Sequence, residues 1–153
     1  MEINAESIAY TKKTLENYFF LKREEAKNRK EAFILGMEIE DECKINGMSY
    51  GGINGNGCSA SYPKDSYINQ LIKEQAGYDA EADACERKYK SLDKENRINE
   101  RLSKISNDQQ KLIIFAFDKN VNYKYIAKEL YEGTSKQAVY QRINNAVIAF
   151  MER

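Results

Sequence analysis

The clearest structural signal in the sequence is Tyr125-Ile-Ala-Lys-Glu-Leu130, then Tyr-Glu-Gly-Thr, then Ser135-Lys-Gln-Ala-Val-Tyr-Gln-Arg-Ile143. Together with Tyr123 and Lys124 before it, the first stretch predicts a helix of about two turns, because Ile126, Ala127 and Leu130 share one face. Gly133 would supply the tight turn that follows, and Ser135 is the expected N-cap of a second helix. That second helix continues close to the C-terminus with one apolar side, made of Val139, Ile143, Ala146, Val147 and Phe150.

A further helix is expected just before this pair. Ser106 and Gln109 have the spacing of a capping box, and a helix of about ten residues would follow and end at Asp118-Lys119-Asn120. Its apolar face would consist of Leu112, Ile113, Phe115 and Ala116. Three helices whose last two are joined by a short turn match the helix-turn-helix pattern of DNA-binding proteins, in which the small residue Ala127 lets the two helices cross.

The pattern leaves a row of polar residues facing outward from the last helix. Lys136, Gln137, Tyr140 and Gln141 point away from the apolar side. Gln can bond adenine with two hydrogen bonds, Lys can reach guanine or phosphate, and Tyr can touch sugar or a thymine methyl group. The predicted DNA-binding residues are therefore Ser135, Lys136, Gln137, Tyr140, Gln141, Arg142, Lys124 and Lys128.

Residues 102–151 resemble region 4 of bacterial sigma factors. The likeness is carried by Leu102 to Ile114, by Tyr125-Ile-Ala-Lys-Glu-Leu130, and by Ser135 to Ile143 with Ala146; Tyr125 stands where the family usually has Glu. The resemblance implies contacts to the −35 promoter element from Lys136, Gln137, Tyr140 and Gln141. The whole chain is similar in arrangement to phage late transcriptional regulators of the ArpU/RinA type, although residues 1–100 show no sigma region 2 signature.

The first two thirds of the chain predict a long helical hairpin. Residues 7–46 have apolar residues at intervals of three, four or seven, which indicates one long helix. A loop at 47–64 contains five of the eight glycines, and Asp65 or Ser66 would cap a second helix that reaches about residue 105. The apolar positions of the first helix are Ile8, Leu15, Tyr18, Phe19, Ala26, Phe33, Leu35, Ile39 and Cys43. The two helices could cover each other or form a dimer, and periodicity does not separate these cases.

The expected fold is therefore all-α, with two domains: residues 1–105 as a hairpin or arm with the Gly-rich loop at 47–64, and residues 106–153 as a helix-turn-helix module. The charge follows this division. Residues 101–153 contain nine basic and five acidic side chains, which leaves 15 basic and 19 acidic ones in residues 1–100. This asymmetry of +4 against −4 is of the kind that accompanies a polyanion-binding end.

Composition excludes several other classes of protein. The chain of 153 residues contains no His, which removes the commonest general base and every His-bearing zinc site. Cys43, Cys58 and Cys85 form no C-x-x-C pair, so they are expected to be reduced thiols in a cytoplasmic protein. Clustered carboxylates are interpreted as solvated helix faces. No enzymatic activity, metal, cofactor or membrane segment is expected.

The function expected from these features is that of a sequence-specific transcriptional regulator that binds double-stranded DNA, with RNA polymerase and a second copy of the chain as further candidate partners. Two alternatives remain open. One is a subunit like the small terminase subunits that package phage DNA, which also join a helix-turn-helix to oligomerising helices. The other is a polymerase-binding interaction protein that does not read DNA.

Overall fold

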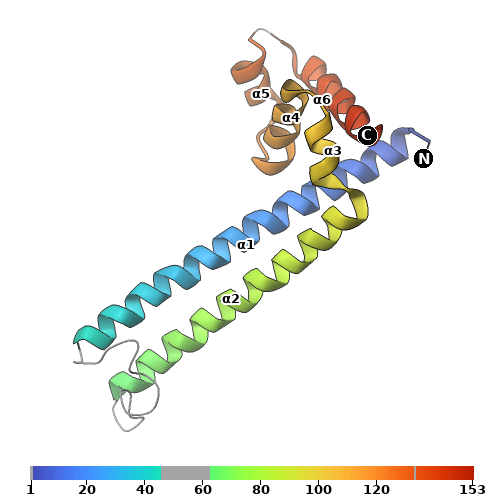
Figure 1. Cartoon of the computed structure of the whole chain (residues 1–153). Coiled ribbons are helices and arrows are strands. Elements are labelled where there is room, and N and C mark those ends of the chain that lie inside the picture. Colours follow the sequence, from blue (N-terminus) through green and yellow to red (C-terminus); the bar gives the residue numbers. More distant parts are fainter. Residues whose placement is uncertain (1, 46–62, 133) are drawn as a thin grey trace. The chain divides into compact units, whose positions relative to one another are not determined.

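The computed structural model describes residues 2–45, 63–132 and 134–153, and every regular element in these ranges is a helix. The elements are α1 (Ala5–Ile45), α2 (Pro63–Asn96), α3 (Ile98–Lys104), α4 (Asn107–Ile113), the π-helical turn η2 (Ile114–Asp118), α5 (Tyr123–Leu130) and α6 (Lys136–Met151) (Figure 1). The all-α prediction is confirmed. Nearly all of the predicted Gly-rich loop and the predicted turn residue Gly133 lie outside the described residues.

The chain forms two compact units, and their limits do not follow the expected division at residue 105. One unit consists of residues 1–23 and 87–153, and the other consists of residues 24–86. Both long helices pass from one unit into the other, which is why a division by sequence order does not describe them. The unit of residues 1–23 and 87–153 is called the terminal unit below, and the unit of residues 24–86 is called the hairpin unit.

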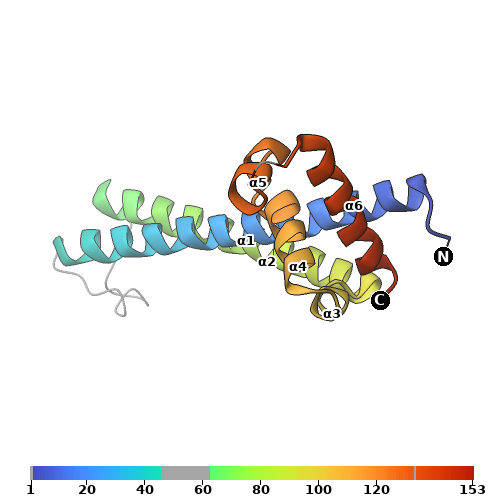
Figure 2. The same ribbon diagram turned by 90° about the horizontal axis from the view of Figure 1, so that it is seen from above.

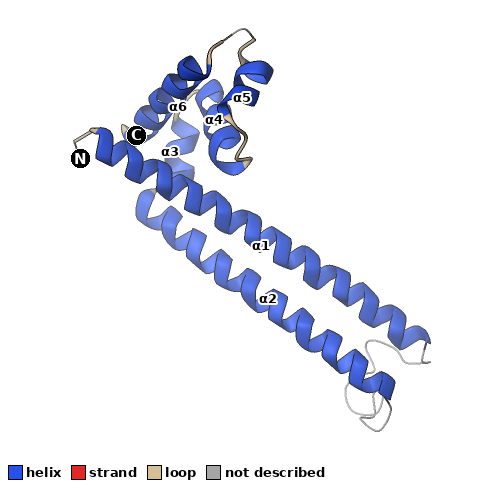
Figure 3. Cartoon of the chain, turned by 180° about the vertical axis from the view of Figure 1, so that it is seen from behind, coloured by secondary structure: helices blue, strands red, loops and turns tan. Residues whose placement is uncertain are grey.

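In the hairpin unit, α1 and α2 run antiparallel and side by side (Figure 3). Ile39, Cys43, Ile68 and Leu71 are buried together near the end of the hairpin. At Ala32, the contact between α1 and α2 is made by small and polar groups. Ala32 is buried, and Gln75 Nε2 donates a hydrogen bond of 3.2 Å to the carbonyl oxygen of Ala32. The hairpin unit therefore has few large side chains in its interior.

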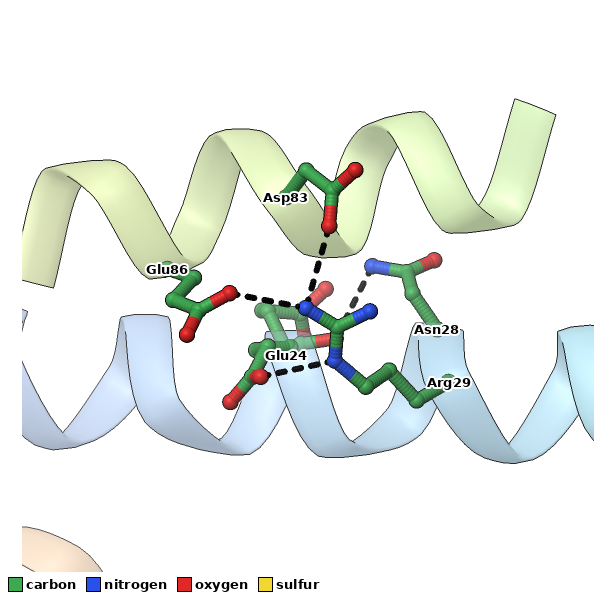
Figure 4. A network of polar contacts seen from close by, with 6 residues as sticks. Glu24, Asn28, Arg29, Asp83 and Glu86 are labelled. Carbon is green, nitrogen blue, oxygen red and sulfur yellow. Dashed lines mark hydrogen bonds and ion pairs between the residues drawn. The ribbon is translucent and has the colours of Figure 1, made fainter. Parts of the chain in front are cut away.

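An ion-pair network joins the two helices of this unit (Figure 4). Arg29 Nε lies 2.8 Å from Glu25 Oε1. Arg29 Nη2 lies 3.1 Å from Asp83 Oδ1 and 2.9 Å from Glu86 Oε2. Hydrogen bonds to Glu25 and Asp83 raise the pKa of Arg29 above its usual value. One guanidinium thus holds three carboxylates, which fixes the register of α1 against α2.

In the terminal unit, the helices α3 to α6 gather along the first part of α1 (Figure 2). Their shared core contains residues of every one of these helices, and three of its members come from α1: Leu15, Tyr18 and Phe19. Tyr18 Oη also donates to Asn99 Oδ1 over 3.1 Å. Arg23 donates to the carbonyl oxygens of Phe117, at 3.1 Å, and of Asp118. The N-terminal part of α1 is therefore part of the fold of the last third of the chain.

Two predicted boundaries of the second long helix are wrong. The helix begins at Pro63, so Asp65 and Ser66 lie within its first turns and do not cap it; proline suits the first helical position because its missing N–H would be unpaired there. The helix also does not continue to residue 105. It breaks at Arg97, whose φ of 54° and ψ of 44° are left-handed, and α3 starts at Ile98.

The predicted apolar face of α1 is wrong at Ala26 and Phe33, which are exposed. Phe33 precedes the buried Ile39 by six residues, which places it about 120° around the helix from Ile39. Ala32 is buried in its place. Intervals of seven residues drift around a straight helix, so a stripe traced through them leaves the buried side.

Candidate nucleic-acid interface

The helices α4, α5 and α6 are each capped by a polar side chain. Ser106 and Gln109 form the predicted capping box, and Ser135 caps α6 as predicted, with its Oγ accepting from Ala138 N at 3.2 Å. Asn122 caps α5 by accepting from Tyr125 N at 2.8 Å. The predicted apolar side of α6 is buried throughout. These caps and this buried side determine which residues of α5 and α6 face outward.

The predicted helix after Ser106 differs from the structure in its second half. Its α-helical part ends at Ile113 and is followed by the π-helical turn η2. A π turn contains more than four residues, so it shifts the buried face. Phe117 is buried as a result, whereas Phe115 and Ala116, both predicted on the apolar face, are only partly buried.

The predicted DNA-binding residues of α6 are exposed, and Gln137 and Gln141 lie opposite its buried face. Lys136 and Tyr140, three residues before Val139 and Ile143 respectively, lie beside that face. Lys136, Gln137, Gln141 and Arg142 are exposed, and Tyr140 is 46% exposed. Because residues four apart lie above one another on a helix, Lys136 and Tyr140 form one row and Gln137 and Gln141 form the next. Side chains of Lys, Tyr and Gln thus stand together on one accessible surface.

A cleft of about 500 Å³ lies where α5 meets the start of α6. Lys124 and Lys128 from α5 and Lys136 from α6 line it, together with Ala127, Glu129, Glu132 and Thr134. The structure therefore brings three of the predicted DNA-binding lysines to one cleft. The two glutamates offset part of their charge, so the cleft has a modest positive excess.

Tyr140 is held in place by Tyr123 and by Lys12, a residue of α1. Its ring lies 5.8 Å from the ring of Tyr123, and Lys12 Nζ lies 4.5 Å from the centre of the Tyr140 ring. The pKa of Tyr123 is raised above its usual value. Burial of the side chain is the main cause, and the nearby Tyr140 and Glu16 contribute less. In the sequence, Lys12 is one of the charged residues of mixed sign in the first long helix, which indicate only a solvated helix face. No local pattern links it to α6, because the two segments lie at opposite ends of the chain.

Besides Tyr140, two further predicted DNA-binding residues already have partners within the chain. The Ser135 hydroxyl is occupied by the helix cap described above. The guanidinium carbon of Arg142 lies 4.1 Å from the centre of the Tyr131 ring, a cation–π contact that directs this side chain toward the segment between α5 and α6. Lys136, Gln137 and Gln141 make no side-chain hydrogen bond or ion pair within the described residues, so they are available to a ligand.

In the described ranges, no three His, Cys, Asp or Glu side chains are grouped so that they could hold a metal ion. No helix there is both long and apolar enough to span a membrane. No family model, no curated protein and no solved structure matches the chain.

Proposed function

We propose that this protein is a non-enzymatic, sequence-specific DNA-binding protein that regulates transcription, and that α6 enters the major groove of double-stranded DNA. The observation that carries the proposal is the exposed surface of α6, where Gln137 and Gln141 stand opposite a fully buried apolar side and Lys136 and Tyr140 lie next to them. An α-helix fits the major groove, and these side-chain types make the contacts that distinguish base pairs there.

The charged residues near α6 have a separate role in the proposal. Lys124 and Lys128 would contact phosphate groups, which adds affinity without sequence preference. The N-terminal end of α6 adds to this, since the free N–H groups of a first helical turn attract anions. Lys12 and Tyr123 would position Tyr140 without touching the bases.

The experiment that tests the proposal is selection of bound sequences from a pool of duplexes with randomised centres. We expect the protein to enrich one motif. The Gln137→Ala/Gln141→Ala variant should lose this motif, because each base contact is worth about 1–3 kcal/mol of discrimination. The Gln70→Ala/Lys73→Ala variant is the control; it removes two exposed polar side chains from one face of α2, one of them a glutamine, and should enrich the same motif.

Salt dependence separates the roles of the two residue groups. Replacing Lys124 and Lys128 by Ala should weaken binding to all sequences and reduce the slope of log K against log salt by about 1.8, since each phosphate that is no longer neutralised lowers the slope by about 0.9. The selected motif should stay the same. If the pool yields no motif, or if the Gln137→Ala/Gln141→Ala variant enriches the wild-type motif, the proposed role of α6 is wrong.

A further inference from the structure

The hairpin unit has an exposed apolar face on α1. Phe33 is 67% exposed, Met37 is 46% exposed and Ile34 is 41% exposed. Phe33 and Met37 are four residues apart and Ala26 is seven residues before Phe33, so these three lie on one side of the helix, with Ile34 next to them. This group is called the α1 outer face below.

The interior of the hairpin unit is built from smaller side chains than the α1 outer face. Next to Phe33, the contact with α2 uses Ala32 and Gly36, where the Gln75 side chain fills the space. The apolar cluster of the hairpin unit, Ile39, Cys43, Ile68 and Leu71, lies near one end of the hairpin only. Two helices with so little buried apolar volume form a thin structure, and small scaffolds of this kind commonly gain stability by association.

The charges next to the α1 outer face are basic before Phe33 and acidic after Met37, and Lys44 lies beyond the acidic residues, paired with Glu40. Lys27 and Lys30 precede Phe33, and Glu40 and Asp41 follow Met37. All four are exposed. If a second α1 lies antiparallel against the first, with Phe33 opposite Met37 of the second copy, Lys30 comes opposite Glu40 of that copy. Lys27 and Asp41 then lie at the edges of the same contact. A parallel arrangement would place like charges opposite each other.

We propose that the α1 outer face binds the same face of a second copy of this chain. The two hairpins would then form an antiparallel four-helix bundle with two-fold symmetry, in which Phe33 and Met37 of both copies make the central apolar layers. The proposal concerns residues 24–86 and does not depend on DNA binding, so its failure and the failure of the proposed function are separate results.

The first test is the mass of the full-length protein in solution, measured without DNA by sedimentation equilibrium over a range of concentrations. We expect a reversible dimer. Phe33→Asp/Met37→Asp should remain monomeric at concentrations where the wild type is dimeric. Both side chains are exposed in the single chain, so the variant should keep its helix content in circular dichroism. A wild-type protein that stays monomeric throughout would overturn the proposal.

The second test checks the antiparallel pairing by charge reversal. Lys30→Glu places two acidic groups opposite each other at both symmetric contacts, and Glu40→Lys places two basic groups there. We expect either variant alone to dimerise about tenfold more weakly than wild type, since two exposed ion pairs are replaced by repulsion. An equimolar mixture of the two variants should restore wild-type affinity. In the mixed dimer, the carboxylate introduced at position 30 of one chain meets the ammonium group introduced at position 40 of the other.

The mixture of the two variants also controls for effects of the substitutions within a single chain. Glu40 Oε1 lies 3.2 Å from Lys44 Nζ, and Glu40→Lys removes this ion pair within the helix whether or not a dimer forms. Only pairing between chains can be restored by mixing. Two results would overturn the antiparallel arrangement. One is that each variant alone dimerises with wild-type affinity, and the other is that both dimerise weakly and the mixture does so as well.

Discussion

The Glu100 carboxylate ties Arg97, the residue at the break between α2 and α3, to α3. It accepts a hydrogen bond from Arg97 Nε at 2.7 Å and lies 2.8 Å from Lys104 Nζ. Arg97, and then Lys104, lower the pKa of Glu100 from its usual 4.5 to about 2. The residue that adopts the left-handed conformation is thus tied to the helix that follows it.

This interaction predicts a loss of stability as the solution is made acidic. A carboxyl group with a lowered pKa in the folded state stabilises the protein above its unfolded pKa of about 4.5, and the contribution is lost as the pH falls toward 2. Glu100→Gln should make the decline in unfolding free energy between these pH values shallower. In the intact protein, an NMR titration should give a midpoint near 2, and Lys104→Met should raise it less than Arg97→Met. A Glu100 midpoint at 4.5 would contradict the geometry.

At the scale of single helices, much of the fold could be predicted because it depends on local chemistry. The capping box at Ser106, the Ser135 cap and the buried side of α6 all follow from neighbouring residues, and the structure has them. The break at Arg97 and the π turn η2 have no comparable local signal, since Arg rarely adopts positive φ and no motif marks a π turn. They depend on packing in the terminal unit.

A glycine within α2 gives a test at this scale. A methyl group added at Gly77 would meet no atom within 4 Å, and the residue is exposed in the middle of a long helix. Gly77→Ala should therefore raise the free energy of unfolding by about 1 kcal/mol, measured by urea denaturation. Gly36→Ala is the comparison. Its methyl group would come within 2.8 Å of Gln75 Nε2 and disturb the bond to Ala32, so it should stabilise less.

At the scale of the whole molecule, the division of the chain into two compact units could not be predicted from the sequence. Leu15 and Tyr18 lie far in sequence from Ile126 and Val139, yet all four share one core. Helical periodicity indicates that each segment has a buried side but does not indicate its partner. The same reason explains the candidate site: the exposure of Gln137 and Gln141 could be predicted from α6 alone, whereas the contact of Lys12 with Tyr140 could not.

The shared core predicts that a change in α1 will loosen α6. Leu15→Ala should destabilise the terminal unit by about 2–5 kcal/mol and increase hydrogen exchange at buried amides of α6, such as that of Ile143. Ile39→Ala removes a buried aliphatic side chain from the hairpin unit and should leave exchange in α6 unchanged. Equal effects of the two variants on α6 would mean that the two units unfold together.

The placement of Leu15, Tyr18 and Phe19 in this core also bears on how the chain is made on the ribosome. These side chains are translated well before the helices that cover them. At about 5–20 residues per second, synthesis of the stretch between Phe19 and the end of α6 takes on the order of ten seconds. During that interval the nascent helix exposes its apolar side. The core of the terminal unit therefore cannot close until α6 has been synthesised.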